Sequence, residues 1–134
     1  GAWGGGGGGV SRFPQTLEVG YYRRSRVLKE RKWRHMEHID ACGSSREEVI
    51  LATVLRGARI VLEPNMFPYD CPPGVSHWTL WSADFLTEQE VEEFLGAWLA
   101  ENLPAALEWG HDDNMSDGLS INLFHIHVYI RCAV

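Results

Sequence analysis

The clearest alternation of apolar and polar positions lies near the C-terminal end of the chain, in residues 119–131. Successive side chains of a β-strand point to opposite faces, so this period of two predicts a strand. His125, His127, Tyr129 and Arg131 share one face, and the other face is apolar. We expect the apolar face to lie in the core and the histidine face to carry the chemistry. The apolar positions are Phe124, Ile126, Val128 and Ile130.

A helical pattern begins at Thr87, because Thr87 and Glu90 have the spacing of a capping box. Apolar residues follow at intervals of three and four, which is typical of a helix that buries one side. The pattern predicts a helix that packs on a sheet and ends before Pro104. Its apolar positions are Val91, Phe94, Leu95, Trp98 and Leu99.

Weaker patterns predict the remaining elements. A helix is expected over about residues 15–40, and a second one, capped by Ser44 or Ser45, over about 46–56. Three prolines restrict the loop 66–74, which we expect to form an ordered rim over a pocket. Three further strands are expected over residues 58–63, 76–82 and 105–109, and a polar loop over 110–118.

This order of elements predicts an α+β fold, in which helices pack against an antiparallel sheet of four or more strands. A chain of 134 residues has the length of a single domain. Residues 1–12 are rich in glycine and are expected to form a flexible leader. We expect residues 13–134 to form the single domain, with a helical part at about 15–56 and a sheet-containing part at about 58–134.

The cysteines and the apolar runs bear on location. Cys42, Cys71 and Cys132 are odd in number and lack a C-x-x-C spacing, which argues against a disulfide framework. We therefore expect an intracellular, reducing compartment, the cytoplasm. No apolar run approaches the roughly 20 residues of a membrane span, so no membrane association is expected.

Charge is distributed unevenly along the chain. Residues 1–59 carry 11 of the 12 Lys and Arg residues but only 6 of the 18 Asp and Glu residues. The simplest interpretation is that the basic helical segment 23–34 packs across the acidic half. No nucleic-acid motif accompanies the basic residues, so we do not expect binding to nucleic acid. A protein partner or a larger assembly stays open.

Two histidines that are two residues apart on a strand have Cβ atoms about 6.5 to 7 Å apart. His125 and His127 can therefore act together on one phosphate or one metal ion. No resident cofactor is expected; the alternative is a divalent transition metal held by neutral imidazoles. Its candidate ligands are His77, His111, His125 and His127.

Several segments, in this order, resemble the fungal N-acetylglucosamine-induced protein family, a domain of unknown function. They are Cys42-Gly43-Ser44, residues 63–69 (Glu-Pro-Asn-Met-Phe-Pro-Tyr), residues 74–82 (Gly-Val-Ser-His-Trp-Thr-Leu-Trp-Ser), Ser120-Ile121, His125 to Val128, and Arg131. That family brings no established reaction that could be carried over.

A more distant resemblance is to the histidine-triad superfamily of nucleotide hydrolases and transferases. Phe67-Pro68-Tyr69 resembles its loop, His77 its strand histidine, and residues 125–131 its final motif, with Tyr129 in place of the third histidine. The resemblance implies a HIT-like fold in which His127 is the nucleophile and His125 supports it. A register anchored on Ser120 would make His125 the nucleophile instead. The side chains implied to contact substrate are Asn114, Ser120, Arg131, His77, Tyr129, Trp78, Trp81 and Phe67.

Three classes of function follow from these observations. One is a nucleotide or phosphoramidate hydrolase or transferase that uses a strand-borne histidine. Because tyrosine is not a proton carrier near neutral pH, the altered triad equally fits a non-catalytic ligand-binding domain or a small subunit of a larger assembly. The third is a histidine-ligated metal site. The expected small-molecule partner is a nucleotide or another phosphorylated compound.

Overall fold

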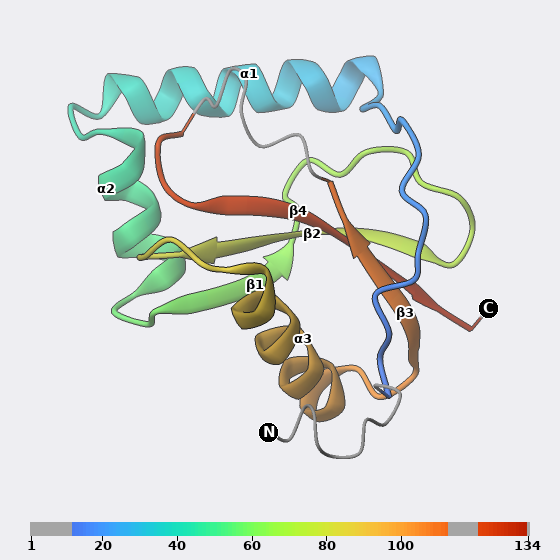
Figure 1. Cartoon of the computed structure of the whole chain (residues 1–134). Helices are drawn as coiled ribbons and strands as arrows, with labels where there is room; N and C mark the ends of the chain where they lie inside the picture. Colours follow the sequence, from blue (N-terminus) through green and yellow to red (C-terminus); the bar gives the residue numbers. More distant parts are fainter. Residues whose placement is uncertain (1–11, 113–120, 134) are drawn as a thin grey trace.

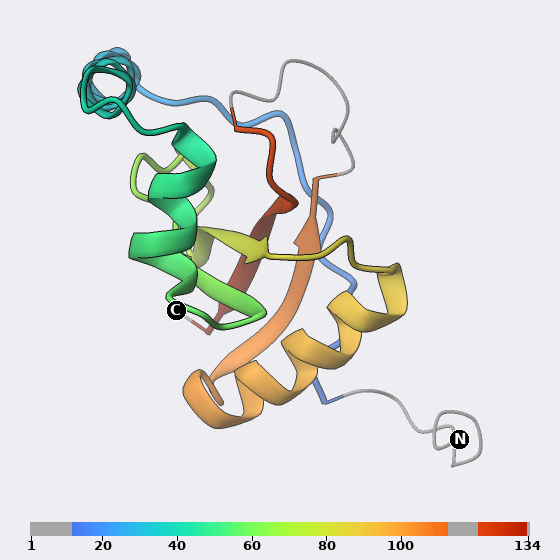
Figure 2. The ribbon, with the colours of Figure 1, turned by 90° about the vertical axis from the view of Figure 1, so that its left-hand side faces the viewer.

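The protein is a three-layer structure in which helices cover both faces of one sheet (Figures 1 and 2). The structure is a computed structural model and describes residues 12–112 and 121–133. Helices α1 (Arg26–Ala41) and α2 (Arg46–Ile50), the latter continued by the π-helical turn η1 (Leu51–Leu55), cover one face. Helix α3 (Glu88–Asn102) covers the other.

The sheet has the strand order β1-β2-β4-β3, and every neighbouring pair is antiparallel. Its strands are β1 (Ile60–Pro64), β2 (Val75–Ser82), β3 (Ala106–His111) and β4 (His125–Cys132). The predicted α+β class with a four-stranded antiparallel sheet is therefore confirmed. Strand β2, which carries His77, and strand β4, which carries His125 and His127, are paired at the centre of the sheet.

Helix α3 forms as the sequence predicts. Thr87 accepts from the backbone N–H of Glu90, whose carboxylate accepts in return from the backbone N–H of Thr87. Val91, Leu95 and Leu99 are buried and pack against Ile126, Val128 and Ile130 of β4. Burying a side chain of this kind contributes about 1.5–3 kcal/mol. The apolar face of β4 is thus the centre of the main core.

Helix α1 is shorter than predicted and begins at Arg26, after the N-cap Ser25. The residues before it run in an extended path along β3, where the backbone N–H of Leu17 donates to Trp109 O and Trp109 N–H donates to Pro14 O. These bonds to an edge strand satisfy backbone groups that a helix would satisfy internally, so Leu17 and Tyr21 lie outside the helix. We call residues 13–17 the edge strap.

Strand β4 also begins later than predicted, at His125 rather than at residue 119. Its neighbour β2 ends at Ser82, one residue beyond Trp81, which is the pairing partner of His125. Ser82, the last residue of β2, donates its backbone N–H to the carbonyl oxygen of Phe124, and β2 offers no further residue for the ladder. Ile121 packs instead among the side chains under α1 and α2.

The basic helix α1 lies against residues of the acidic half: Met36 packs with Trp81 and Ile121, and Arg24, just before the helix, donates to the carbonyl oxygen of Phe67. Helices α1 and α3, which carry many of the opposite charges, lie on opposite faces of the sheet (Figure 2). Within α1, Arg26 forms an ion pair with Glu30. No helix in the described part of the chain is long and apolar enough to cross a membrane.

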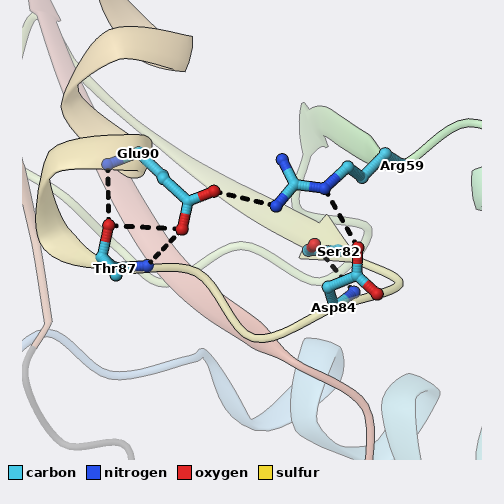
Figure 3. A network of polar contacts seen from close by, with 5 residues as sticks. All are labelled: Arg59, Ser82, Asp84, Thr87 and Glu90. Carbon is cyan, nitrogen blue, oxygen red and sulfur yellow. Dashed lines mark hydrogen bonds and ion pairs between the residues drawn. The ribbon is translucent and has the colours of Figure 1, made fainter.

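Arg59, at the end of the basic half, forms ion pairs with two acidic residues of the other half (Figure 3). Arg59 donates to Asp84 at 3.0 Å and to Glu90 at 2.8 Å. Glu90 also belongs to the capping box with Thr87. This network ties the start of β1 to the first turn of α3.

Candidate functional site

The antiparallel register aligns the functional side chains in rows across three strands. Thr79 of β2 lies between Glu63 of β1 and His127 of β4. In neighbouring rows Trp81 pairs with His125, and His77 pairs with Tyr129. His77, His125 and His127 therefore lie on one face of the sheet, the one beneath α1 and α2. His125 and His127 line the cavity on that face, whereas His77 does not, so the expectation that all three form one wall of a shared pocket is not met in full.

Hydrogen bonds fix the tautomers of the first two histidines. The backbone N–H of Tyr69 donates to Nδ1 of His77 at 3.0 Å, so that nitrogen carries a lone pair. A neutral His77 then has its proton on Nε2, which lies 2.6 Å from Nδ1 of His127. His127 must accept there and carry its own proton on Nε2. Three groups thus form a directional relay from Tyr69 through His77 to His127.

Both relay histidines are neutral at pH 7. Burial, followed by His127 and Arg24, lowers the pKa of His77 to about 3. Burial, followed by His125 and Arg24, lowers the pKa of His127 to about 4. Stacked rings enclose the relay, with centroids of Tyr69 and His77 4.5 Å apart and those of His77 and Tyr129 4.9 Å apart. The lowered pKa values keep the proton pattern of the relay fixed.

His125 carries its ring proton on Nδ1, whereas His127 carries its proton on Nε2. Its Nδ1 lies 2.7 Å from the carbonyl oxygen of Leu123, which can only accept, so Nδ1 carries the proton. The neutral ring then has its lone pair on Nε2. Its ring packs against Trp81 with centroids 4.8 Å apart. The ring centroids of His125 and His127 are 6.3 Å apart, so one donor and one acceptor lie side by side.

A cavity of about 120 Å³ lies between this face and the helical layer. Its wall is mainly apolar, and the polar side chains on it include both histidines, His35, Thr79 and Asn65. Three ionisable groups beyond the histidines also line it: Arg24, Lys32 and Glu63. The apolar part of the wall comprises Met36, Ile39, Ile50, Val54, Pro64, Met66, Phe67, Trp81 and Ile121.

The loop after β1 forms one edge of the cavity, as predicted, and hydrogen bonds hold it. Asn65 donates from Nδ2 to Thr79 Oγ1 at 2.8 Å and accepts from the backbone N–H of Phe67 at 2.9 Å. Arg24 donates from Nε to the carbonyl oxygen of Phe67. Its guanidinium also lies over the ring of Tyr69, 4.5 Å from the centroid. The loop therefore positions Tyr69, the first group of the relay, and Arg24, a cation of the cavity wall.

Burial shifts the ionisable groups of the wall in opposite senses. The pKa of Lys32 is lowered by burial and by the charges of Arg24 and Arg46. The pKa of Glu63 is raised by burial. The wall therefore holds one permanent cation, Arg24, beside Lys32 and Glu63, whose charged forms are both disfavoured, and an anionic ligand group would stabilise the charge of Arg24 and Lys32.

Several predicted contact residues lie elsewhere. Trp78 is on the α3 face, 5.3 Å from Trp98 between ring centroids, because neighbouring residues of a strand alternate between faces. Arg131 pairs with Glu108 at 2.6 Å, near the end of β4, and does not line the cavity. Tyr129 is buried behind His77. These three are corrections to the predicted contact set.

Phe67 and Trp81 do line the cavity, as predicted. His77 does not line the cavity; it contacts His127, which does, through the hydrogen bond between Nε2 of His77 and Nδ1 of His127. Asn114 and Ser120 lie outside the described residues.

Sequence reasoning missed Arg24, Lys32, Glu63, Thr79 and Asn65. The basic residues were noticed only as a run, whereas Lys32 lies four positions before the buried Met36 and therefore on the inward side of α1. That spacing was the signal that separates it from the solvent-facing charges. Glu63 and Thr79 could be found only from the register between strands.

The histidines do not gather into the metal site considered from the sequence. His111 is bonded to Glu88 of α3 at 3.1 Å and does not line the cavity that the other histidines share. Both ring nitrogens of His77 are engaged by Tyr69 and His127. Over residues 12–112 and 121–133 there is no group of three or more His, Cys, Asp or Glu side chains arranged to hold a metal ion. A metal stays an untested alternative.

Comparison with known proteins gives a fold-level neighbour. No family model and no curated protein matches this chain, so both family resemblances stay expectations. One solved structure, described as the crystal structure of HTC1, is similar over 84% of this chain and 77% of that chain, with 19% sequence identity and a TM-score of 0.49. A similarity of that extent carries no inference about what this chain does.

Proposed function

We propose that this domain binds a small organic acid, a carboxylate or a phosphate ester, whose apolar body occupies the cavity under α1 and α2. The observation that carries the proposal is the relay, because it makes His127 a neutral donor whose Nε2–H is left for a ligand. Arg24 and Lys32 line the same cavity and supply positive charge.

The proposal follows from the composition of the cavity wall, which is mainly apolar and carries a few polar and charged side chains. An apolar cavity with a few convergent polar groups is the usual form of a small-molecule site. A volume of about 120 Å³ is below the roughly 300–1,000 Å³ of drug-sized pockets, so it suits a small ligand or one part of a larger one. Arg24 uses Nε on Phe67, and the rest of its guanidinium is available to an anion.

Calorimetric titration with 4-methylpentanoate and with adenosine 5′-monophosphate tests the proposal. We expect at least one of them to bind, and Arg24→Met to weaken binding about tenfold to a hundredfold, because a hydrogen bond to a charged group contributes about 1.5–3 kcal/mol. Arg24→Lys should recover part of the affinity. Arg26→Met is the matched control, because that side chain is 92% exposed.

Binding of neither acid, or equal losses in Arg24→Met and Arg26→Met, would contradict the proposal. The unfolding midpoint of each variant shows whether a loss of binding reflects loss of the fold.

A second candidate is hydrolysis of a nucleoside phosphoramidate, with His125 as nucleophile. The observation that favours it is the Nε2 lone pair of His125, which follows from the bond between Nδ1 and Leu123 O. His127 as nucleophile stays a prediction, and its tautomer weighs against it, because its Nδ1 already accepts from His77. In this reaction His127 would instead donate to a phosphate oxygen.

Hydrolysis of adenosine 5′-phosphoramidate distinguishes the two assignments. His125→Asn should abolish turnover and any covalent phosphohistidine, whereas His127→Asn should lower the rate while the phosphohistidine still forms. A phosphohistidine that is lost only in His127→Asn would restore the assignment made from the sequence. No turnover in the unaltered protein would leave the binding proposal standing alone.

A further inference from the structure

Lys32 differs from the other basic residues of α1 in where its amine lies. It lines the cavity from the inward side of the helix, one turn before the buried Met36. Its neighbours in charge are Arg24 and Arg46, and over the described residues no carboxylate forms an ion pair with it. Arg46 is itself engaged with Asp40. Lys32 therefore lies on a mainly apolar wall, and its amine forms no ion pair with the described residues, the carboxyl group of Glu63 on the same wall included.

A lysine in such surroundings loses the advantage of its charged form. Burial removes hydration from the ammonium group, and the nearby cations of Arg24 and Arg46 repel it, so the pKa of Lys32 is lowered. A larger share of Lys32 than of an exposed lysine is thus the free amine, which is the nucleophilic form. This chemistry needs a carbonyl compound as its partner.

We propose that Lys32 forms an imine with a small aldehyde or ketone that also carries an acidic group and an apolar body, as a 2-oxo acid with a branched aliphatic side chain does. The inference rests on the proposed function, because the same cavity and the same cations would hold the acidic group. It adds the identity of the reacting side chain and the class of ligand that reacts.

The neighbouring imidazoles have the polarities that the reaction needs. The Lys32 nitrogen attacks the carbonyl carbon, and the carbonyl π electrons move to oxygen, which takes a proton and becomes a hydroxyl group. The nitrogen loses a proton, for which the Nε2 lone pair of His125 is an acceptor in the cavity. His127 offers its Nε2–H to the carbonyl oxygen during attack.

The second half of the reaction releases water. The hydroxyl group takes a proton and leaves as water while the nitrogen lone pair forms the C=N bond, and the resulting iminium ion releases its nitrogen proton to give the imine. The net reaction is amine plus carbonyl compound giving imine plus water, with no change of oxidation state, and it is reversible. Sodium borohydride makes it irreversible by delivering hydride to the imine carbon, which yields a secondary amine.

The sequence allows a sharp experiment, because its only lysines are Lys29 and Lys32. Lys29 is exposed on the same helix and is the matched control. The full chain is incubated with 2-oxo-4-methylpentanoate, reduced with sodium borohydride, and mapped by peptide mass spectrometry. We expect the adduct on Lys32, its retention in Lys29→Arg and its loss in Lys32→Arg.

Equal labelling of the two lysines, or labelling of the terminal amine and Lys29 alone, would overturn the inference. A loss of the fold in Lys32→Arg is checked by its unfolding transition, and Lys29→Arg keeps the test valid in that case, because it leaves Lys32 as the single lysine.

Calorimetry with 2-hydroxy-4-methylpentanoate separates this inference from the proposed function. The hydroxy acid has the same charge and nearly the same shape but cannot form an imine. If it binds and the oxo acid is not trapped on Lys32, the imine inference fails and the binding proposal stands. Both the imine inference and the binding proposal fail if none of the three acids binds and no adduct forms. The three acids are the hydroxy acid, 4-methylpentanoate and adenosine 5′-monophosphate.

Discussion

A histidine that accepts hydrogen bonds on one nitrogen and donates from the other behaves as a fixed dipole, and His77 does so between Tyr69 and His127. Alternation along the strand placed His125 and His127 on one face, because it is a local property, whereas the position of His77 beside them depends on the register between β2 and β4. The sequence did not reveal which nitrogen carries each proton. That depends on the backbone N–H of Tyr69 and the carbonyl of Leu123, which only the folded chain brings to the rings.

The relay predicts how stability depends on pH. The pKa values of His77 and His127 are about 3 and about 4 when folded, below the 6.5 or so of the unfolded chain. Between these limits the unfolded state binds more protons, so the free energy of unfolding falls as pH falls below about 6.5 and continues to fall toward pH 4. The slope is up to about 1.4 kcal/mol per pH unit for each histidine.

Urea unfolding between pH 4 and pH 7.5 measures this slope. Carboxylates contribute in the same direction, so the comparison is with the double variant His77→Asn/His127→Asn, which should have a shallower slope. His38→Asn, at an exposed position of α1, should keep the slope of the unaltered protein. Equal slopes in all three proteins would show that the relay histidines are not neutral in the folded state.

At the scale of single elements, the short helix α2 depends on its N-cap. The sequence left Ser44 and Ser45 as alternatives; in the structure Ser45 accepts from the backbone N–H of Glu48, and Glu48 accepts from the backbone N–H of Ser45. A five-residue helix has little internal stability of its own. Its position matters because Ile50 lines the cavity and Glu47 holds the backbone N–H of Asn122.

Ser45→Ala should therefore lower the free energy of unfolding by about 1 kcal/mol, the usual cost of losing an N-cap. Ser44→Ala, one residue earlier and also exposed, is the control and should change it by less than about 0.5 kcal/mol. Thermal and urea denaturation of the two variants measure the difference. A larger loss in Ser44→Ala would mean that the helix begins one residue earlier.

The edge strap is a second element that local patterns did not predict. It passes so near Gly110 of β3 that a Cβ atom there would clash with the carbonyl oxygen of Leu17. Helical spacing of Leu17, Tyr21 and Leu28 favoured a helix because a pattern of apolar residues cannot show which backbone groups a distant strand will satisfy. Only the pairing with Trp109 decides it.

Gly110→Ala should displace the strap and lower the free energy of unfolding by about 1–3 kcal/mol, as overpacking does. Gly96→Ala is the matched control, because a Cβ atom there meets nothing within 4 Å and lies in α3. Replacing a helical glycine by alanine should stabilise by about 0.4–1 kcal/mol. Equal changes in the two variants would contradict the close approach at Gly110.

At the scale of the whole molecule, the charged helices α1 and α3 lie on opposite faces of the sheet (Figure 2). The sequence showed that charge is distributed unevenly along the chain. It did not show on which face of the sheet each charged helix lies, because neither composition nor periodicity determines which face a helix covers. The class of the fold was predictable from the order of the elements. The strand order β1-β2-β4-β3 was not, since it rests on long-range pairing.

Because its charges are exposed, the network around Arg59 should contribute little to stability. Arg59→Met should lower the free energy of unfolding by no more than about 1 kcal/mol, and the loss should shrink as salt is raised to 1 M. Unfolding in urea at low and high salt measures both effects. A loss above 3 kcal/mol that is independent of salt would mean that the network is shielded from solvent.

The edge strap also governs how this chain meets other copies of itself. Unpaired N–H and C=O groups along an outer strand are a template for sheet extension between molecules. The strap occupies those groups on β3 through Leu17 and Pro14, and β1 at the other edge is short and ends in proline. Removing residues 1–17 would open β3 to intermolecular pairing. Light scattering should then detect ordered association of molecules that keep their internal sheet.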